Sequence, residues 1–126
     1  MSTDLFEICS TILKNIGEEG EFMLVSLIDG DGITICNWGD ESHIELLYHI
    51  SVQLERPIRA LREATDGTAL DELICSDVSK MSYIFRYFIV KGEQYTLATV
   101  LRRNQSYRRA TSKAIKELTS FLNLNF

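Results

Sequence analysis

Histidine, proline and tryptophan are scarce in this chain, and the scarcity limits the chemistry it can perform. The 126 residues include one proline, one tryptophan and two histidines, His43 and His49. Six positions apart on one helix, these histidines would point away from each other and could not share a metal ion. No P-loop, zinc-ligand spacing or nucleophile elbow is present. We therefore expect no catalytic residue, no metal and no cofactor, which means that the protein is not an enzyme.

Long apolar runs and a basic leader are also missing. No segment approaches the roughly 20 apolar residues of a membrane span, and the acidic start MSTDLFEICS is unlike a signal peptide. The three cysteines, Cys9, Cys36 and Cys75, are odd in number and widely spaced, which favours reduced thiols. These absences predict a cytoplasmic protein without a membrane partner, and the length predicts a single domain over residues 1–126.

Charge is unevenly distributed along the chain. The formal net charge of −5 argues against nucleic acid as a partner. Residues 1–45 hold ten acids against one base, a net of −9, whereas residues 80–116 hold nine bases against one acid, a net of +8. Either the two segments lie together and neutralise each other, or the basic one meets an acidic partner, and we favour the first interpretation.

The stretch LIDGDGITICNWGD, residues 27–40, places two aspartates next to two glycines. A calcium loop would need an oxygen ligand in place of Ile33 and a glycine in place of Thr34. A phosphate-binding loop would need a third glycine at Ile35 and a lysine after it. Asp-Gly between two β-rich runs is instead a strong hairpin signal, because glycine adopts positive φ at little cost. The stretch is predicted to be a turn.

Hydrophobic periodicity predicts eight elements in the order α-β-β-α-β-β-β-α. Helices are expected over residues 5–16, 43–65 and 105–122, and strands near residues 21–28, 32–38, 73–77, 81–90 and 95–101. Gly17 is expected to stop the first helix, Gly67 to follow the second and Asn104 to cap the last. Pro57 either kinks the second helix or begins a new one in its first turn, and we favour the kink.

The strand patterns also predict where each strand lies in the sheet. Residues 81–90 are apolar on both faces, so this strand needs cover on both sides. Doubly apolar strands suit central places and short ones suit edges, which gives a five-stranded, mainly antiparallel sheet of order 2-1-5-4-3. The first and third helices then cover one face and the second helix the other. The fold class is therefore an α/β three-layer sandwich of the α+β type.

The helix expected over residues 43–65 is apolar around too wide an arc for one core. At 100° per residue its apolar side chains span about 240°, against the ~100° that a single core requires. Leu46, Ile50 and Pro57 lie along one flank of this arc. We expect a second apolar contact at that helix, made with another subunit.

Four arginines surround the expected start of the last helix, namely Arg102, Arg103, Arg108 and Arg109. Cations there oppose the helix macrodipole by about 0.3–1 kcal/mol each, so something should compensate them. One hypothesis is an anion or acidic partner bound at the free N–H groups of the helix. The other, which we favour, is neutralisation by the acidic N-terminal segment.

The layout as a whole resembles the roadblock-type dynein light chains, and the bacterial MglB-like members most of all. The resemblance rests on the hairpin SLIDGDGITICNWG, the long helix, and the closing strand and helix YTLATVLRRNQSYRRATSKAIKELTSFL. It covers residues 4–122, and its motifs are apolar patterns and turns. The chain departs from the family in two places. At SYRRATSK the family usually has more apolar residues, and Pro57 interrupts the long helix.

This resemblance implies a cytoplasmic homodimer in which the long helices pack together and the third strands pair. The interface is then expected to include Leu46, Ile50, Gln53, Leu54, Pro57 and Cys75. It also implies a non-enzymatic regulator or scaffold that binds a small Ras-like GTPase, with GTPase activation as one option. Two alternatives stay open: a profilin- or PAS-like module that holds a small ligand between sheet and helix, and a secretion-chaperone-like binding protein. The strands show few polar groups for a ligand pocket.

Overall fold

The computed structural model describes residues 2–65 and 71–125, so Gly67 lies outside the described residues. The elements are α1 (Ser2–Gly20), β1 (Leu24–Ile28), β2 (Thr34–Gly39), a short 3₁₀ helix η1 (Glu41–His43), α2 (Ile44–Gln53), α3 (Glu55–Ala64), β3 (Glu72–Ser76), β4 (Met81–Val90), β5 (Glu93–Arg102) and α4 (Arg108–Asn125). Their order confirms the predicted sequence of helices and strands, except that the second helix is divided.

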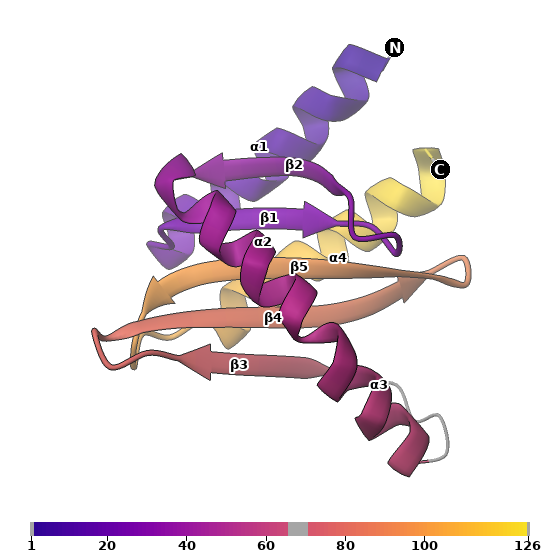
Figure 1. Ribbon diagram of the computed structural model, residues 1–126. Helices are drawn as coiled ribbons and strands as arrows, with labels where there is room; N and C mark the ends of the chain where they lie inside the picture. Colours follow the sequence, from indigo (N-terminus) through magenta and orange to yellow (C-terminus); the bar gives the residue numbers. More distant parts are fainter. Residues whose placement is uncertain (1, 66–70, 126) are drawn as a thin grey trace.

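The five strands form one sheet of order β2-β1-β5-β4-β3, as predicted (Figure 1). Every neighbouring pair is antiparallel, including β1 with β5, where Leu24 faces Val100. Helices α1 and α4 lie side by side on one face, and α2 with α3 crosses the other (Figure 1). The three-layer arrangement is therefore confirmed.

Strand alternation divides the interior into two cores. Leu13 of α1 and Leu118 of α4 pack on Leu97, on one face of β5. Leu47 of α2 packs on the opposite face of the sheet, in a cluster that contains Val100 of the same strand. Because β5 has side chains in both cores, it is apolar on both faces and takes the central position.

Pro57 divides the long helix in two. The helix α2 ends at Gln53, and α3 begins at Glu55, so Pro57 lies in the first turn of α3. The favoured kinked single helix is wrong, and the alternative of a new helix is correct. The physical reason is that proline has no N–H group to donate, and first-turn N–H groups have no partner within their own helix.

Gly17 does not stop α1, which continues to Gly20. The helix ends where Glu21 adopts a φ of 55°. The N–H of Phe22 then donates to the carbonyl oxygen of Gly17 at 2.9 Å, a pattern typical of helices that end on a left-handed residue. Gly17 has a packing role instead, because a Cβ atom there would collide with the ring of Trp38.

The Asp-Gly stretch forms the predicted turn between β1 and β2. Asp29 Oδ1 accepts hydrogen bonds from the N–H groups of Asp31 and Ile33, each at 2.9 Å. Gly32 has a φ of 82°, which is why glycine suits this position. The Asp29 side chain therefore holds the loop together by accepting hydrogen bonds from the backbone N–H groups of other loop residues.

The loop between β3 and β4 is built in the same way without a glycine. Asp77 Oδ1 accepts hydrogen bonds from the N–H groups of Ser79 and Met81, each at 3.0 Å. Lys80, at the position equivalent to Gly32, has a φ of 74°. The bond from the Met81 N–H group is the main reason why the pKa of Asp77 lies below its usual value of 3.8.

Cys9 of α1 and Cys36 of β2 form a disulfide between two buried residues, with their Cα atoms 6.9 Å apart. The expectation of reduced thiols is wrong for this pair, because spacing along the chain says nothing about which residues α1 covers. Cys75 is a free thiol and exposed, so it does not fill the core as Cys9 does. In the described part of the chain, no helix has the length and apolar character needed to cross a membrane.

Candidate functional site

One flank of α2 and α3 is apolar and uncovered. Leu46 exposes 46% of its surface and Leu61 exposes 45%, and Pro57 is exposed between them. Helical spacing brings these three residues to the same side. Ile50 and Leu54 are half-buried because they also pack on the sheet core below. We call this surface the outer flank, defined by Leu46, Ile50, Gln53, Leu54, Pro57 and Leu61.

The strand β3 lies at an edge of the sheet, and among the described strands it pairs only with β4. Its Cys75 is exposed and faces Tyr83 across the pair. Since Tyr83 belongs to the core beneath α2, Cys75 lies on the face of the sheet that α2 and α3 cross. The six expected interface residues are thus five residues of the outer flank and one residue of the edge strand on the same face.

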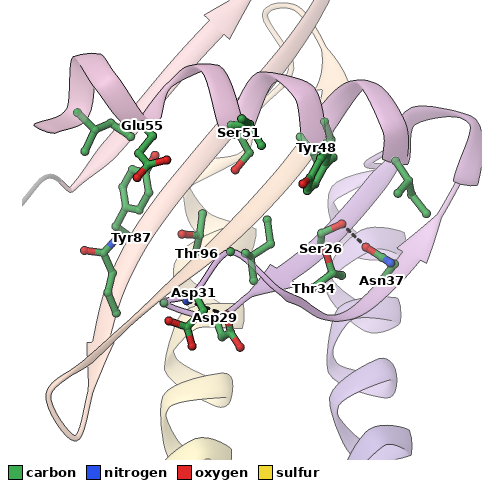
Figure 2. Close-up of a pocket in the computed structure, with 18 of the residues that line it drawn as sticks. Ser26, Asp29, Asp31, Thr34, Asn37, Tyr48, Ser51, Glu55, Tyr87 and Thr96 are labelled. Atoms are coloured by element: carbon green, nitrogen blue, oxygen red, sulfur yellow. Dashed lines mark hydrogen bonds between the residues drawn. The ribbon is translucent and has the colours of Figure 1, made fainter.

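The opposite flank of α2 borders a pocket of about 620 Å³ between the helices and the sheet (Figure 2). Ser26 of β1 and Thr96 of β5 lie in its floor, at 2% and 9% exposure. The expectation that the strands offer few polar groups for a pocket is therefore wrong. Ser26 in LVSLI and Thr96 in YTLAT were the visible signals, since each is a hydroxyl residue within an otherwise apolar strand.

Hydrogen bonds fix some of the polar groups that line this pocket. Ser26 Oγ donates to Asn37 Oδ1 at one end (Figure 2). At the other end, Arg62 Nη2 donates to Gln94 Oε1. Burial raises the pKa of Tyr87 to about 12, although the positive charge of Arg62 acts in the opposite direction. The Tyr87 phenol therefore stays protonated at neutral pH.

Arg108, in the first turn of α4, has an intramolecular partner. Its Nη2 lies 2.9 Å from Glu72 Oε2, and this hydrogen bond is the main reason why the pKa of Arg108 is raised. The hydroxyl of Tyr107 donates to the same carboxylate oxygen at 3.2 Å. The partner lies on β3, and not in the acidic N-terminal segment that we favoured.

Arg102 and Arg103 of the expected anion site lie apart from Arg108 and its neighbour Arg109. Arg102 ends β5 opposite Met81, whereas Arg108 lies near Arg86, five residues further along β4. Five strand residues span roughly 16 Å. Asn104 is not the helix cap, because α4 begins only at Arg108. Arg103 follows Arg102 and Arg109 follows Arg108, so the four arginines form two separate pairs instead of one group.

The two charged segments are nevertheless neighbours, since α1 packs against α4. Lys113 Nζ lies 3.5 Å from Glu19 Oε2 across this contact. Of the described residues, no three His, Cys, Asp or Glu side chains are grouped to hold a metal ion. His43 lies 3.7 Å from Asp40, and the largely exposed His49 lies 3.7 Å from Glu45.

The comparisons with known proteins divide between sequence and structure. No family model matches the sequence, and no curated protein sequence matches it. Among solved structures, Myxococcus xanthus MglB is similar with a TM-score of 0.77 and 18% identity, over 93% of this chain and 89% of that one. The gliding protein mglB of Thermus thermophilus has a TM-score of 0.74 and 14% identity, over 93% of this chain and 90% of that one. A Roadblock/LC7 domain from Streptomyces avermitilis has a TM-score of 0.72 and 13% identity, over 90% of this chain and 96% of that one.

This chain has the roadblock fold. The match spans nearly the whole chain and agrees with the resemblance seen in the sequence. Two surfaces of this fold stand out as candidate sites. One is the outer flank with the edge of β3, and the other is the pocket on the opposite flank of α2.

Proposed function

We propose that this protein is a non-enzymatic homodimer that regulates or scaffolds a small Ras-like GTPase. The roadblock fold supports the proposal, because the resemblance to that family implies both a dimer and a GTPase partner. The single observation that carries it is the outer flank, an uncovered apolar surface beside a free strand edge. The anion or acidic-partner site at Arg102, Arg103, Arg108 and Arg109 stays a secondary part of the proposal.

A dimer would satisfy both parts of this surface at once. Removing apolar side chains such as Leu46 and Leu61 from water would stabilise the dimer by roughly 25 cal/mol for each Å² of apolar surface buried. The free N–H and C=O groups of β3 gain partners when a second β3 pairs with them. A two-fold axis allows each element to meet its own copy. The two sheets would then become continuous across the dimer.

The dimer is tested by sedimentation equilibrium of the purified chain at micromolar concentration, where we expect twice the chain mass of 14.4 kDa. The partner is tested by affinity capture from the source cells in the presence of GTP and of GDP, followed by mass spectrometry. A Ras-like GTPase enriched with one nucleotide is the expected result, and reconstitution would show whether hydrolysis is stimulated. A monomer, or stoichiometric GTP binding by the isolated chain, would overturn the proposal.

A second candidate function, a small-ligand module of the profilin or PAS type, is favoured by one observation. The pocket between α2, α3 and the sheet lies where such modules hold their ligands. Co-purification separates the two functions, because a sensory module would carry a small molecule and a GTPase regulator a protein.

A further inference from the structure

The pocket beside α2 and α3 has both apolar and polar side chains in its roof and a polar floor, and the proposed GTPase function makes no use of it. Its volume of about 620 Å³ falls within the range typical of small-molecule sites, roughly 300–1,000 Å³. Ile44 and Leu47 of α2 and Ile58 of α3 contribute the apolar part of the roof, beside polar residues such as Ser51. Such a combination suits a ligand with an apolar body and a few polar groups.

Two neighbouring hydroxyl groups in the pocket have no hydrogen-bond partner within residues 2–65 and 71–125. Thr96 is nine-tenths buried, and Tyr87 lies directly opposite it across the β4–β5 pair. Figure 2 shows both side chains between the helices and the loop that carries Asp29 and Asp31. Each hydroxyl can donate and accept a hydrogen bond. Together they form a place for one hydroxyl group of a ligand.

The charges around the pocket have a negative balance. The lining holds four acids and two bases, Asp29, Asp31, Glu45, Glu55, Arg59 and Arg62, which gives a net charge of −2. Arg59 Nη2 lies 2.9 Å from Glu55 Oε1, so this pair is neutralised within the chain. Asp31 has no ion-pair partner among the described residues. A positive ligand group is therefore favoured near the Asp29–Asp31 loop.

We propose that this pocket binds a small organic amine that has an apolar body and a distal hydroxyl group. The ammonium group lies at the Asp29–Asp31 loop, the body lies under Leu47 and Ile58, and the hydroxyl group meets Thr96 and Tyr87. No covalent step is involved. The inference does not depend on a GTPase, so it is tested on the purified chain alone.

Four related probes separate the charge from the hydroxyl group. Tyramine carries both groups, phenethylamine lacks the hydroxyl, tyrosol lacks the charge, and 4-hydroxyphenylacetate carries the opposite charge. Each is titrated into the ¹⁵N-labelled chain, and the amide shifts are followed by NMR. We expect shifts confined to the pocket lining, and tyramine binding at least about threefold more tightly than tyrosol. The inference fails if no probe shifts the pocket residues, or if the anion binds as well as tyramine.

Two conservative variants locate the contacts. Thr96→Val keeps the side-chain volume but removes the hydroxyl, and should weaken tyramine about fivefold while leaving phenethylamine unchanged. Asp31→Asn should weaken tyramine about threefold and leave tyrosol unchanged. Glu18→Gln is the matched control, because it removes an exposed acid from α1 on the other face of the sheet. Unchanged tyramine affinity in both pocket variants would overturn the inference, and if Thr96→Val fails to fold, the surface variant Asp31→Asn decides.

Discussion

The guanidinium group of Arg108 and the carboxylate of Glu72 lie 2.9 Å apart and join the first turn of α4 to the edge strand β3. The same carboxylate lies 3.8 Å from Arg86 Nε, within ion-pair range although too far for a hydrogen bond. Arg86 also donates to the carbonyl oxygen of Arg108 and to the hydroxyls of Thr111 and Ser112. One acid is therefore shared by two bases where α4 begins.

Glu72→Gln should lower the melting temperature, because it leaves the Arg86 side chain, only 13% exposed, without a counter-charge. We expect a loss of about 1–3 kcal/mol in the free energy of unfolding. Circular dichroism during thermal unfolding measures it. Arg108→Ala should lower the melting temperature as well, whereas Arg109→Ala should not, since the described residues offer Arg109 no ion pair. Equal losses in the two arginine variants would contradict this interpretation.

Leu46→Glu should weaken the proposed homodimer, because the dimer would bury a carboxylate without a partner. At least a tenfold rise in the dissociation constant is expected, or about 1.4 kcal/mol. Analytical ultracentrifugation over a concentration series measures it. Ile8→Glu is the matched control, since Ile8 is 48% exposed but lies on α1, which covers the other face of the sheet. If Leu46→Glu stays as dimeric as the wild type, the interface lies elsewhere.

As the pH falls, the Asp77→Asn variant should lose less of its free energy of unfolding than the wild type does. Because the folded-state pKa of Asp77 lies below 3.8, its carboxylate stabilises the fold above that pH. This contribution is lost as the pH falls through the lowered pKa. Urea unfolding at a series of pH values should show the variant less stable than the wild type near neutrality. The two curves should converge in strong acid, and a constant offset would refute the role of the charge.

Tyr87→Phe should change how the free energy of unfolding depends on pH in alkaline solution. The pKa of Tyr87 is raised from 10.0 to about 12, so the unfolded chain releases this proton first. Its contribution to stability is therefore complete below pH 10 and declines as the pH rises from 10 towards 12. Urea unfolding across this range, with tyrosinate absorbance as a second readout, measures it. The phenylalanine variant should lose less stability over the same range than the wild type.

Cys36→Ser should destabilise the fold, because the Cys9–Cys36 disulfide closes a loop with a sequence separation of 27. A loop of this size predicts about 2–4 kcal/mol from the restriction of the unfolded chain. Chemical unfolding of the oxidised protein measures the change. Cys75→Ser should cost much less stability, since this thiol forms no disulfide. Reaction of one thiol per unfolded, non-reduced chain with an alkylating reagent would confirm the pairing.

The sheet order could be predicted from the sequence because three of the four strand connections are short turns. The position of β1 beside β5 then followed from the apolar character of the central strands on both faces. The ends of the helices were less predictable. Gly17 has the local character of a helix end, but it serves the packing of Trp38, which is 21 positions away. Pro57 was compatible with two local structures, and the sequence did not distinguish them.

The candidate sites were predictable only in part, because they depend on contacts between distant residues. The outer flank could be predicted because its apolar residues recur at helical spacing within one segment of the sequence. The partner of Arg108 could not, since Glu72 lies 36 positions away on another element. The Cys9–Cys36 pair was missed for the same reason. The pocket was missed because Ser26 and Thr96 belong to strands that are far apart in sequence, although β1 and β5 are neighbours in the sheet.

The contact between Gly17 and Trp38 constrains how this chain can diverge. The indole ring occupies the space that any side chain at position 17 would need. A larger residue at position 17 is therefore tolerated only after position 38 has become smaller, whereas position 38 can shrink first without a collision. The two substitutions have a required historical order. Descendants of this sequence should accumulate changes at position 38 alone or at both positions, and lineages altered at position 17 alone should be absent.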